Sequence, residues 1–278
     1  MNQLVSIIIP TKNSSMFLEN TLKSIKEQSY KKIEIIIVDN KSTDKTLEIA
    51  RKYRCKVFQF NPKVSIGRFD ASHKRNYGVT KAKGEYVYYV DADMELTKNV
   101  VSDCVRLCNK GFDCIMVPED SFGIGIWAQA KYLQRHCYIG DDELESPRFF
   151  KKKVWQALGG LDVEMGGGGD DWDLSLRARE AGYKITRTTE LVMHNEGDLK
   201  LFRLFKKRIM YGKDLPKYLS KQRGHSVKVF LFRKAYLKNW RLFLSHPIIT
   251  CAFIVMRSTE VVGTSLGVML SVAEGNKK

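Results

Sequence analysis

Hydrophobic and polar residues alternate along the first third of the chain in blocks that predict strands separated by helices. Four apolar runs predict strands, at Leu4–Ile9, Ile33–Val38, Lys56–Phe60 and Glu85–Val90. Helical spacing between these runs predicts three helices, over Ser15–Gln28, from Ser42 or Thr43 to Tyr53, and over Asp70–Ala82. Strands that alternate with crossover helices in this way are typical of a parallel α/β sheet.

The pattern continues less regularly to about residue 198. Further elements are predicted as a helix over Thr97–Asn109, a strand over Cys114–Val117, a helix with aromatic residues within Ser121–Gly140, a strand over Arg148–Lys151 and a helix over Val154–Leu158. Four consecutive glycines, Gly166–Gly169, predict a mobile loop, since glycine is costly inside a regular element. The segment Asp170–Ala181, with acids in its first turn and Gly182 after its end, predicts a helix.

The charge is distributed unevenly and divides the chain in two. The net charge is +16, of which residues 1–198 carry +2 and residues 199–278 carry +14. With 44% hydrophobic residues, the chain can bury a sizeable core, which excludes general disorder. We therefore predict an ordinary α/β domain over residues 1–198 and a basic helical tail over residues 199–278.

The tail has the composition of a segment that binds membranes. Lys200–Arg241 contains 14 lysines and arginines, one acid and many apolar residues at helical spacing, which predicts an interfacial helix on an anionic membrane surface. Pro247–Ala273 is long enough to span a bilayer, but Arg257 and Glu260 near its middle would be costly in lipid. We expect it to lie in the interface, and a single span stays open. The alternative is a solvated basic helix that packs on the domain.

The six cysteines favour a reducing compartment, because the chain shows no secretory leader and Leu4–Ile9 is too short for one. Cys104, Cys108 and Cys114 lack the partner ligands of a zinc pattern, so we expect them to pack in the core. Together with the membrane-like tail, this predicts a peripheral protein on the cytoplasmic side of a membrane.

Acidic residues gather where the predicted strands end. Asp91 and Asp93 follow a strand and lie two residues apart, so their carboxylates face the same way and suit a hard divalent cation that bridges to phosphate. Two solvated acids are the alternative. A phosphatase with a nucleophilic aspartate would carry Thr or Val where this chain has Glu95. Asp39 follows another strand, where a carboxylate can accept a hydrogen bond from a nucleobase or form a turn.

Two further residues could take part in chemistry. Asp171 follows the glycine run, and an ionised carboxylate there can take a proton from an attacking hydroxyl. Capping of the helix accounts for Asp170 but not for all three acids of the first turn. His194 ends an apolar run, where a histidine either packs in the core or, as a neutral imidazole, serves as a metal ligand.

These pieces resemble the family 2 glycosyltransferases, which have the A-type glycosyltransferase fold with a Rossmann-like mixed sheet. The resemblance covers about residues 1–198. The matching stretches, in family order and spacing, are Val5–Asn13, Ile37–Asp44, Lys74–Gly78, Gly84–Tyr86, Asp91–Asp93, Gly159–Asp162, Asp170–Arg177, Ala181–Ile185 and His194.

The resemblance implies an inverting, metal-dependent enzyme that transfers a sugar from a nucleotide sugar, with UDP-sugar favoured over GDP-sugar. It implies that Pro10, Thr11 and Asp39 hold the nucleoside, that Arg75 lies near the diphosphate, and that Asp91 contacts the ribose or metal. Asp93 and His194 would bind Mn²⁺ or Mg²⁺, and Asp171 would be the catalytic base. The chain departs from the family at Asn40 and Asp170, where a second acid and a glutamate are usual.

Three rival functions explain fewer of these residues. A sugar nucleotidyltransferase would carry a glycine-rich loop after the first strand, where this chain has Thr11-Lys12-Asn13-Ser14. A dinucleotide-dependent oxidoreductase would need Gly-x-Gly-x-x-Gly there. A basic nucleic-acid-binding protein leaves the acids unexplained. With its membrane-like tail, the chain is expected to glycosylate a lipid-linked saccharide or a polyprenyl carrier, and to bind no nucleic acid.

Overall fold

The computed structural model describes residues 3–61, 70–165, 169–221 and 233–275, and the chain divides into two compact units. The first unit comprises Met1–Glu119, Asp142–Val163 and Asp171–Asn195. The second comprises Asp120–Asp141, Glu164–Asp170 and Glu196–Lys278. Residues 120–141 thus join the C-terminal segment, a grouping that the sequence pattern did not indicate.

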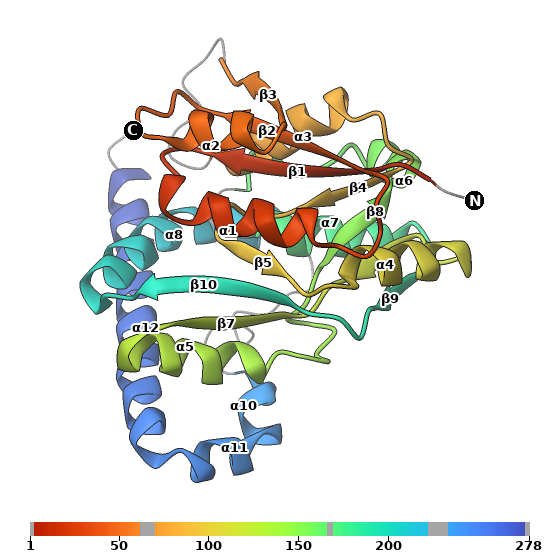
Figure 1. Ribbon diagram of the computed structural model, residues 1–278. Helices are drawn as coiled ribbons and strands as arrows, with labels where there is room; N and C mark the ends of the chain where they lie inside the picture. The colour runs from red at the N-terminus through yellow and green to blue at the C-terminus, as the bar shows by residue number, and fades with distance from the viewer. Residues whose placement is uncertain (1–2, 62–69, 166–168, 222–232, 276–278) are drawn as a thin grey trace. The chain divides into compact units, whose positions relative to one another are not determined.

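A seven-stranded mixed sheet forms the centre of the first unit (Figure 1). Its order is β3 (Lys56–Gln59), β2 (Ile33–Asp39), β1 (Val5–Thr11), β4 (Tyr86–Tyr89), β8 (Pro147–Lys151), β6 (Cys114–Met116) and β9 (Ile185–Arg187). The first four strands run parallel, as predicted, whereas β8 runs antiparallel to both of its neighbours. The start of β8 therefore lies beside the carboxyl end of β4.

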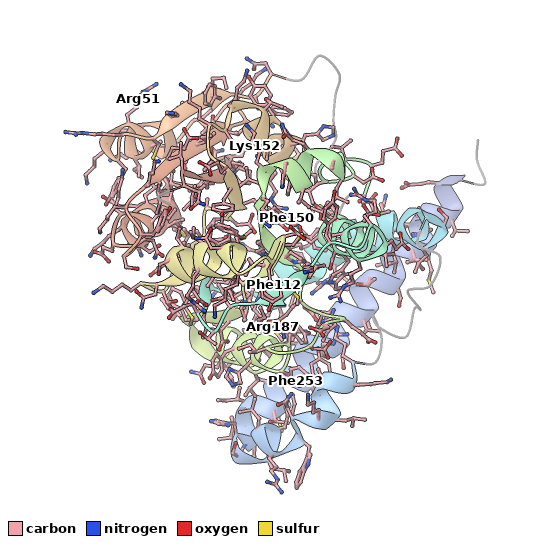
Figure 2. The ribbon with its side chains drawn as sticks, turned by 90° about the vertical axis from the view of Figure 1, so that its right-hand side faces the viewer. Arg51, Phe112, Phe150, Lys152, Arg187 and Phe253 are labelled. Carbon is pink, nitrogen blue, oxygen red and sulfur yellow. The ribbon has the colours of Figure 1, made fainter. Side chains whose placement is uncertain are left out.

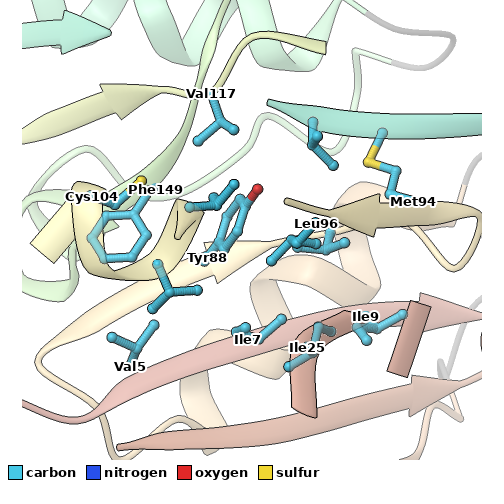
Figure 3. Packing of buried hydrophobic residues seen from close by; sticks show 14 of the residues in the cluster. Val5, Ile7, Ile9, Ile25, Tyr88, Met94, Leu96, Cys104, Val117 and Phe149 are labelled. Carbon is cyan, nitrogen blue, oxygen red and sulfur yellow. The ribbon is translucent and has the colours of Figure 1, made fainter. Parts of the chain in front are cut away.

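Helices cover both faces of this sheet, because side chains alternate between the faces along each strand. One face packs against α1 (Ser15–Lys26), α2 (Thr46–Lys52) and α4 (Val100–Asn109), and the other against α3 (Ala71–Lys81), α6 (Lys152–Ala157) and α7 (Asp170–Glu180). Figure 3 shows part of the first core, in which Ile7 of β1, Tyr88 of β4 and Phe149 of β8 gather. Tyr89, one residue further, points to the opposite core.

The predicted start of α2 is wrong by about three residues. The helix begins at Thr46, and its N-cap position is Lys45 rather than Ser42 or Thr43. Ser42 instead donates its backbone N–H and its hydroxyl to the carboxylate of Asp39. The residue that could have capped the helix is thus held by the end of β2.

A small second sheet was not predicted. It has the order β5 (Met94–Leu96), β10 (Val192–Asp198) and β7 (Glu119–Ile124), with β10 antiparallel to β5. The helix predicted within Ser121–Gly140 is wrong in its first part, because β7 precedes α5 (Gly125–His136). Gly123 allows β7 to lie close to β10. A Cβ at this position would lie 2.7 Å from the carbonyl oxygen of Gly197, so only glycine lets the backbones of the two strands approach.

The second unit is mainly helical around its own core. It contains α5, α8 (Leu201–Lys221), α10 (Lys234–Lys238), α11 (Trp240–Ser245) and α12 (Pro247–Gly275). The buried residues of this core are Ala130, Leu204, Ala252, Phe253 and Met256, and Figure 2 labels Phe253 on α12. The helices predicted in the tail are present, although residues 222–232 lie outside the described part of the chain.

Glu260, near the middle of α12, is buried and surrounded by cations. Its side chain is 1% exposed, and its carboxylate lies 3.2 Å from Lys131 Nζ, 2.5 Å from Arg208 Nη2 and 2.6 Å from Arg257 Nη1. Gln134 of α5 donates a further hydrogen bond of 2.9 Å. Because three helices contribute to this cluster, Glu260 ties α12 to α5 and to α8.

We expect Glu260→Ala to lower the free energy of unfolding by about 3–5 kcal/mol, since it leaves buried cations without their shared carboxylate. Glu274→Ala, in the same helix, is the matched control, because Glu274 pairs with Lys213 at the exposed surface. Thermal unfolding followed by circular dichroism measures both variants. Equal effects of the two substitutions would contradict the anchoring role of Glu260.

Two other predictions can be compared with the structure. Cys104, Cys108 and Cys114 are buried in the core, as predicted, and burial raises the pKa of the Cys108 thiol to about 12. The predicted glycine loop falls largely outside the described residues, since these exclude Gly166–Gly168. The helix after it begins at Asp170, as predicted.

Candidate active site

The ends of β1 and β2 bring Thr11 and Asp39 together. The two residues are register partners, and Thr11 Oγ1 donates a hydrogen bond of 2.8 Å to Asp39 Oδ1. Ser42 donates its N–H to Asp39 Oδ2 at 2.9 Å. Pro10, also predicted at this site, pairs with Val38 one step earlier. The three residues predicted to hold a nucleoside thus share one edge of the sheet.

Helix α3 supplies two buried cations to the same edge. Gly78 permits its close packing, because a Cβ there would lie 2.4 Å from Ile8 Cγ2 of β1. Lys74 Nζ donates to the carbonyl oxygen of Thr11 at 3.0 Å and pairs with Asp70. One residue further along the helix, Arg75 is also buried and reaches the end of β4.

Asp91, which follows β4, is held between two guanidiniums. Arg75 Nη2 lies 2.6 Å from Asp91 Oδ1, and Arg148 Nη1 lies 3.4 Å from Asp91 Oδ2. Burial alone would raise the pKa of Asp91, but the two arginines hold it well below its ordinary value. Asp91 therefore stays ionised even in acidic solution.

Asp93 meets His194 because β5 pairs with β10. The pairing places His194 opposite Met94, and His194 Nε2 lies 3.4 Å from Asp93 Oδ2. The other ring nitrogen, Nδ1, lies 2.8 Å from Glu119 Oε1. When Nδ1 donates its hydrogen to this carboxylate, Nε2 keeps a lone pair that could bind a metal ion beside Asp93.

Arg148 joins these two clusters into one network. Its Nη2 lies 2.9 Å from Glu119 Oε2, while its Nη1 faces Asp91. Burial alone would lower the pKa of Arg148, but Glu119 and Asp91 raise it well above its ordinary value. An unbroken series of hydrogen bonds and ion pairs therefore connects the histidine to the arginine of α3.

Asp171, in the first turn of α7, is the last carboxylate of the network. Its Oδ1 lies 2.9 Å from the Tyr89 hydroxyl and 3.6 Å from Arg75 Nη1. Tyr89 is fixed in turn, because its hydroxyl also lies 2.9 Å from the carbonyl oxygen of Pro147, and both arginines lie over its ring. The side chain of Asp171 is 22% exposed, so the carboxylate is positioned and still accessible.

The profile of the family described as "Glycosyl transferase family 2" matches residues 6–164, which is more than half of the chain. The matched segment contains Thr11, Asp39, Arg75, Asp91 and Asp93. The chain belongs to this family.

Curated relatives of this chain support the family assignment over a shorter stretch. The poly(ribitol-phosphate) beta-N-acetylglucosaminyltransferase TarS of Staphylococcus aureus is 34% identical over 107 residues, which cover 38% of this chain and 19% of that protein. A GalNAc(5)-diNAcBac-PP-undecaprenol beta-1,3-glucosyltransferase of Campylobacter jejuni is 33% identical over 113 residues, or 39% of this chain and 35% of that protein. The matches thus span about a fifth to a third of these relatives.

Similarity to solved structures shows that the chain has the A-type glycosyltransferase fold. The mannosyltransferase PcManGT of Pyrobaculum calidifontis, in complex with GDP-Man and Mn²⁺, aligns with a TM-score of 0.60 at 20% identity, covering 100% of this chain and 80% of that one. S. aureus TarS 1–349 with UDP-GlcNAc aligns with a TM-score of 0.54 at 16% identity, covering 98% and 92%. The predicted α/β fold class is therefore confirmed.

The structure also reveals residues of the candidate site that the sequence did not indicate. Arg148 and Glu119 were not predicted, and Tyr89 was read only as part of a buried strand. The position of Arg148 depends on β8 running antiparallel to β4, and sequence periodicity does not show strand direction. The signal that could have revealed it is a basic residue at a strand end in a family that binds diphosphates.

The charges and ligand types of the network fit a divalent cation. Four carboxylates, Asp91, Asp93, Glu119 and Asp171, face two guanidiniums, which leaves two negative charges. Within the described ranges no three histidine, cysteine or acidic residues are placed to enclose a metal ion by themselves. Asp93 and His194 therefore fit an ion whose shell is completed by phosphate oxygens and water.

Proposed function

We propose that the protein is an inverting, metal-dependent hexosyltransferase that moves a sugar from a nucleotide sugar to an acceptor hydroxyl. UDP-sugar is the favoured donor and GDP-sugar the alternative. The observation that carries this proposal is the ion-pair network, because it joins the Asp93–His194 pair to Asp171 through Arg148, Asp91 and Arg75. The proposed reaction needs both a pair of residues that could hold a metal ion and a carboxylate that could act as base, and this network connects them.

Residues at the ends of the parallel strands bind different parts of the donor. Pro10, Thr11 and Asp39 hold the nucleoside, with the Asp39 carboxylate accepting from the base. Asp91 contacts the ribose or the metal ion, and Arg75 is near the diphosphate. Support comes from the placement of these residues along one sheet edge, where α/β sheets collect ligands. The complexes of TarS with UDP-GlcNAc and of PcManGT with GDP-Man support a nucleotide-sugar donor without choosing the base.

Asp171 acts as the general base. Both of its contacts with Tyr89 and Arg75 involve Oδ1, so we assign Oδ2 to the acceptor. As the acceptor oxygen attacks the anomeric carbon, Oδ2 takes its proton and the sugar–phosphate bond breaks on the opposite side. The nucleoside diphosphate leaves with the electron pair, and the anomeric configuration inverts.

Asp93 and His194 would hold the metal ion, which is Mn²⁺ or Mg²⁺. The imidazole nitrogen beside the carboxylate tilts the choice toward Mn²⁺. A bound divalent ion supplies positive charge against the leaving diphosphate. Glu119 keeps His194 in the tautomer that can bind metal, and Arg148 keeps Glu119 in place.

The acceptor is a membrane lipid-linked saccharide or a polyprenyl carrier, and the enzyme acts as a peripheral protein on the cytoplasmic side of the membrane. One helix, Pro247–Glu274, is long and apolar enough to cross a bilayer. The name of the C. jejuni relative contains an undecaprenol-linked substrate. The basic residues of the tail complement an anionic membrane surface.

A panel of UDP- and GDP-sugars tests this function with metal-loaded protein and polyprenyl-linked acceptors. We expect release of a nucleoside diphosphate with one of these donors, and little release without the acceptor. Release of pyrophosphate would instead indicate a nucleotidyltransferase. No turnover of any donor, together with binding of oligonucleotides, would favour the nucleic-acid-binding alternative.

Tyr89→Phe should lower kcat about 10- to 100-fold with little change in the donor KM. It removes a hydrogen bond to a charged group, worth about 1.5–3 kcal/mol, and leaves the donor-binding residues in place. Tyr88→Phe is the matched control, because the Tyr88 hydroxyl is buried and has no hydrogen-bond partner among the described residues. Steady-state kinetics of both variants check this expectation. Equal loss of kcat in both would show that Tyr89 matters only for packing.

A further inference from the structure

Helix α12 has two faces of opposite character. Its inner face, which includes Phe253, Met256 and Glu260, is buried against the rest of the second unit. Along its outer face, apolar residues recur at helical spacing, and their side chains are 38–75% exposed. The exposed apolar residues of this face, called the outer stripe below, are Ile248, Ile254, Val255, Val262, Leu266, Met269, Leu270 and Val272. A stripe of this length is unusual on a soluble surface and marks an interaction site.

The inner face holds α12 firmly to α8. At Gly267 a Cβ would lie 2.1 Å from the carbonyl oxygen of Ile209, and at Gly212 a Cβ would lie 2.1 Å from that of Thr264. The backbones of the two helices therefore touch. Arg208 adds its ion pair with Glu260, and Lys213 pairs with Glu274. Figure 1 shows α8 beside the C-terminal half of α12.

This packing decides between the two ways in which α12 could meet a membrane. If α12 spanned a bilayer, its centre near Glu260 would bring Arg208 and its neighbours in α8 to the same depth. Lys206 and Lys207, which are exposed on α8, would then lie in hydrocarbon. Charged side chains there are costly, whereas at the surface of an anionic leaflet they are favourable.

We propose that α12 lies in the plane of an anionic membrane surface, with its outer stripe in the lipid, and that the positive charge of the C-terminal segment attracts it there. The occupant of the stripe is thus a bilayer surface, and an anionic one is favoured because residues 199–278 carry a net charge of +14. This inference rests on the proposed function, since it specifies how the proposed membrane attachment is built. Ile248 and Val272 would lie about 36 Å apart at equal depth.

The depth of a fluorophore in the bilayer distinguishes an α12 that lies in the membrane plane from an α12 that spans the bilayer. Cys251 is exposed on α12, whereas four of the other five cysteines are buried and Cys55 is partly buried, so the native thiol can be labelled selectively. Val262→Cys and Met269→Cys, each combined with Cys251→Ser, give two further positions. The full chain is mixed with vesicles of phosphatidylcholine and phosphatidylglycerol whose acyl chains carry bromine at defined depths.

We expect all three labels to be quenched at one shallow depth, about 5–10 Å below the headgroups. A span would place the label at position 262 about 16 Å deeper than the label at 251, because eleven helical residues separate them. That result would overturn the proposal. Vesicle binding without quenching, or a stable dimer with unquenched labels, would overturn it as well.

Val262→Glu tests the outer stripe without disturbing the inner face. We expect vesicle binding to weaken at least tenfold and the unfolding midpoint to stay unchanged. Val163→Glu is the matched control, since Val163 is exposed in the first unit. Equal weakening by both, or none by Val262→Glu, would contradict the proposed surface. Transfer to a detergent-dispersed acceptor is measured in parallel, because its loss would concern the proposed reaction rather than the membrane geometry.

Discussion

Asp171→Asn should reduce kcat by about 10²–10⁴-fold, the usual contribution of a general base. The amide keeps the size of the side chain but cannot take the acceptor proton. Nucleotide binding should stay within a few-fold of the original, because Asp171 is proposed to act on the acceptor and not on the donor. Titration calorimetry with UDP and steady-state kinetics measure the two effects separately.

Asp173→Asn is the matched control for this loss. Asp173 lies in the same turn of α7 and pairs with Arg177 four residues later, at 2.6 Å. We expect most of the activity to remain in this variant. Near-normal transfer by Asp171→Asn would reject the assignment of the base, and Asp170 would be the next residue to substitute.

Asp93→Ala should abolish transfer and weaken nucleoside diphosphate binding in the presence of metal, because it removes half of the proposed metal-binding pair. In the absence of metal, the variant and the original protein should bind the nucleotide equally weakly. EDTA should remove activity, and Mn²⁺ should restore it at least as well as Mg²⁺. Full activity in chelator would contradict the metal-dependent reaction.

Glu95→Ala is a suitable comparison. Glu95 lies on β5 two residues after Asp93, where its backbone pairs with Met193. Retention of metal-dependent UDP binding in Glu95→Ala and its loss in Asp93→Ala would assign the effect to the proposed ligand. The same loss in both would point to a general effect of negative charge.

The sequence predicted most of the central sheet because buried strands and amphipathic helices follow simple periodicities. Thr11 and Asp39 could be placed together from their positions at strand ends alone. The short strands were harder: β5 and β9 have three residues each, too few for a period to show. The approach of His194 to Asp93 depends on β5, so the sequence could give it only through the family resemblance.

The same limit explains the residues that were missed. Arg148 lies in the site because β8 runs antiparallel to β4, and Glu119 lies in the site because β7 begins next to Arg148. The local spacing of residues in the sequence shows neither arrangement. Glu260 looked like a costly charge in an apolar helix. Its partners Lys131 and Arg208 come from distant parts of the chain, so only the tertiary structure shows that the charge is satisfied.

The proposed reaction is tested most directly by mass spectrometry of a single transfer experiment. Metal-loaded protein is incubated with the donor that the panel selects and with a polyprenyl-linked saccharide. We predict that nucleoside diphosphate forms in equal amount to an acceptor heavier by one sugar residue, and that both products disappear in Asp171→Asn. An acceptor of unchanged mass beside released nucleoside diphosphate and free sugar, with the same yield in Asp171→Asn, would contradict sugar transfer by this site.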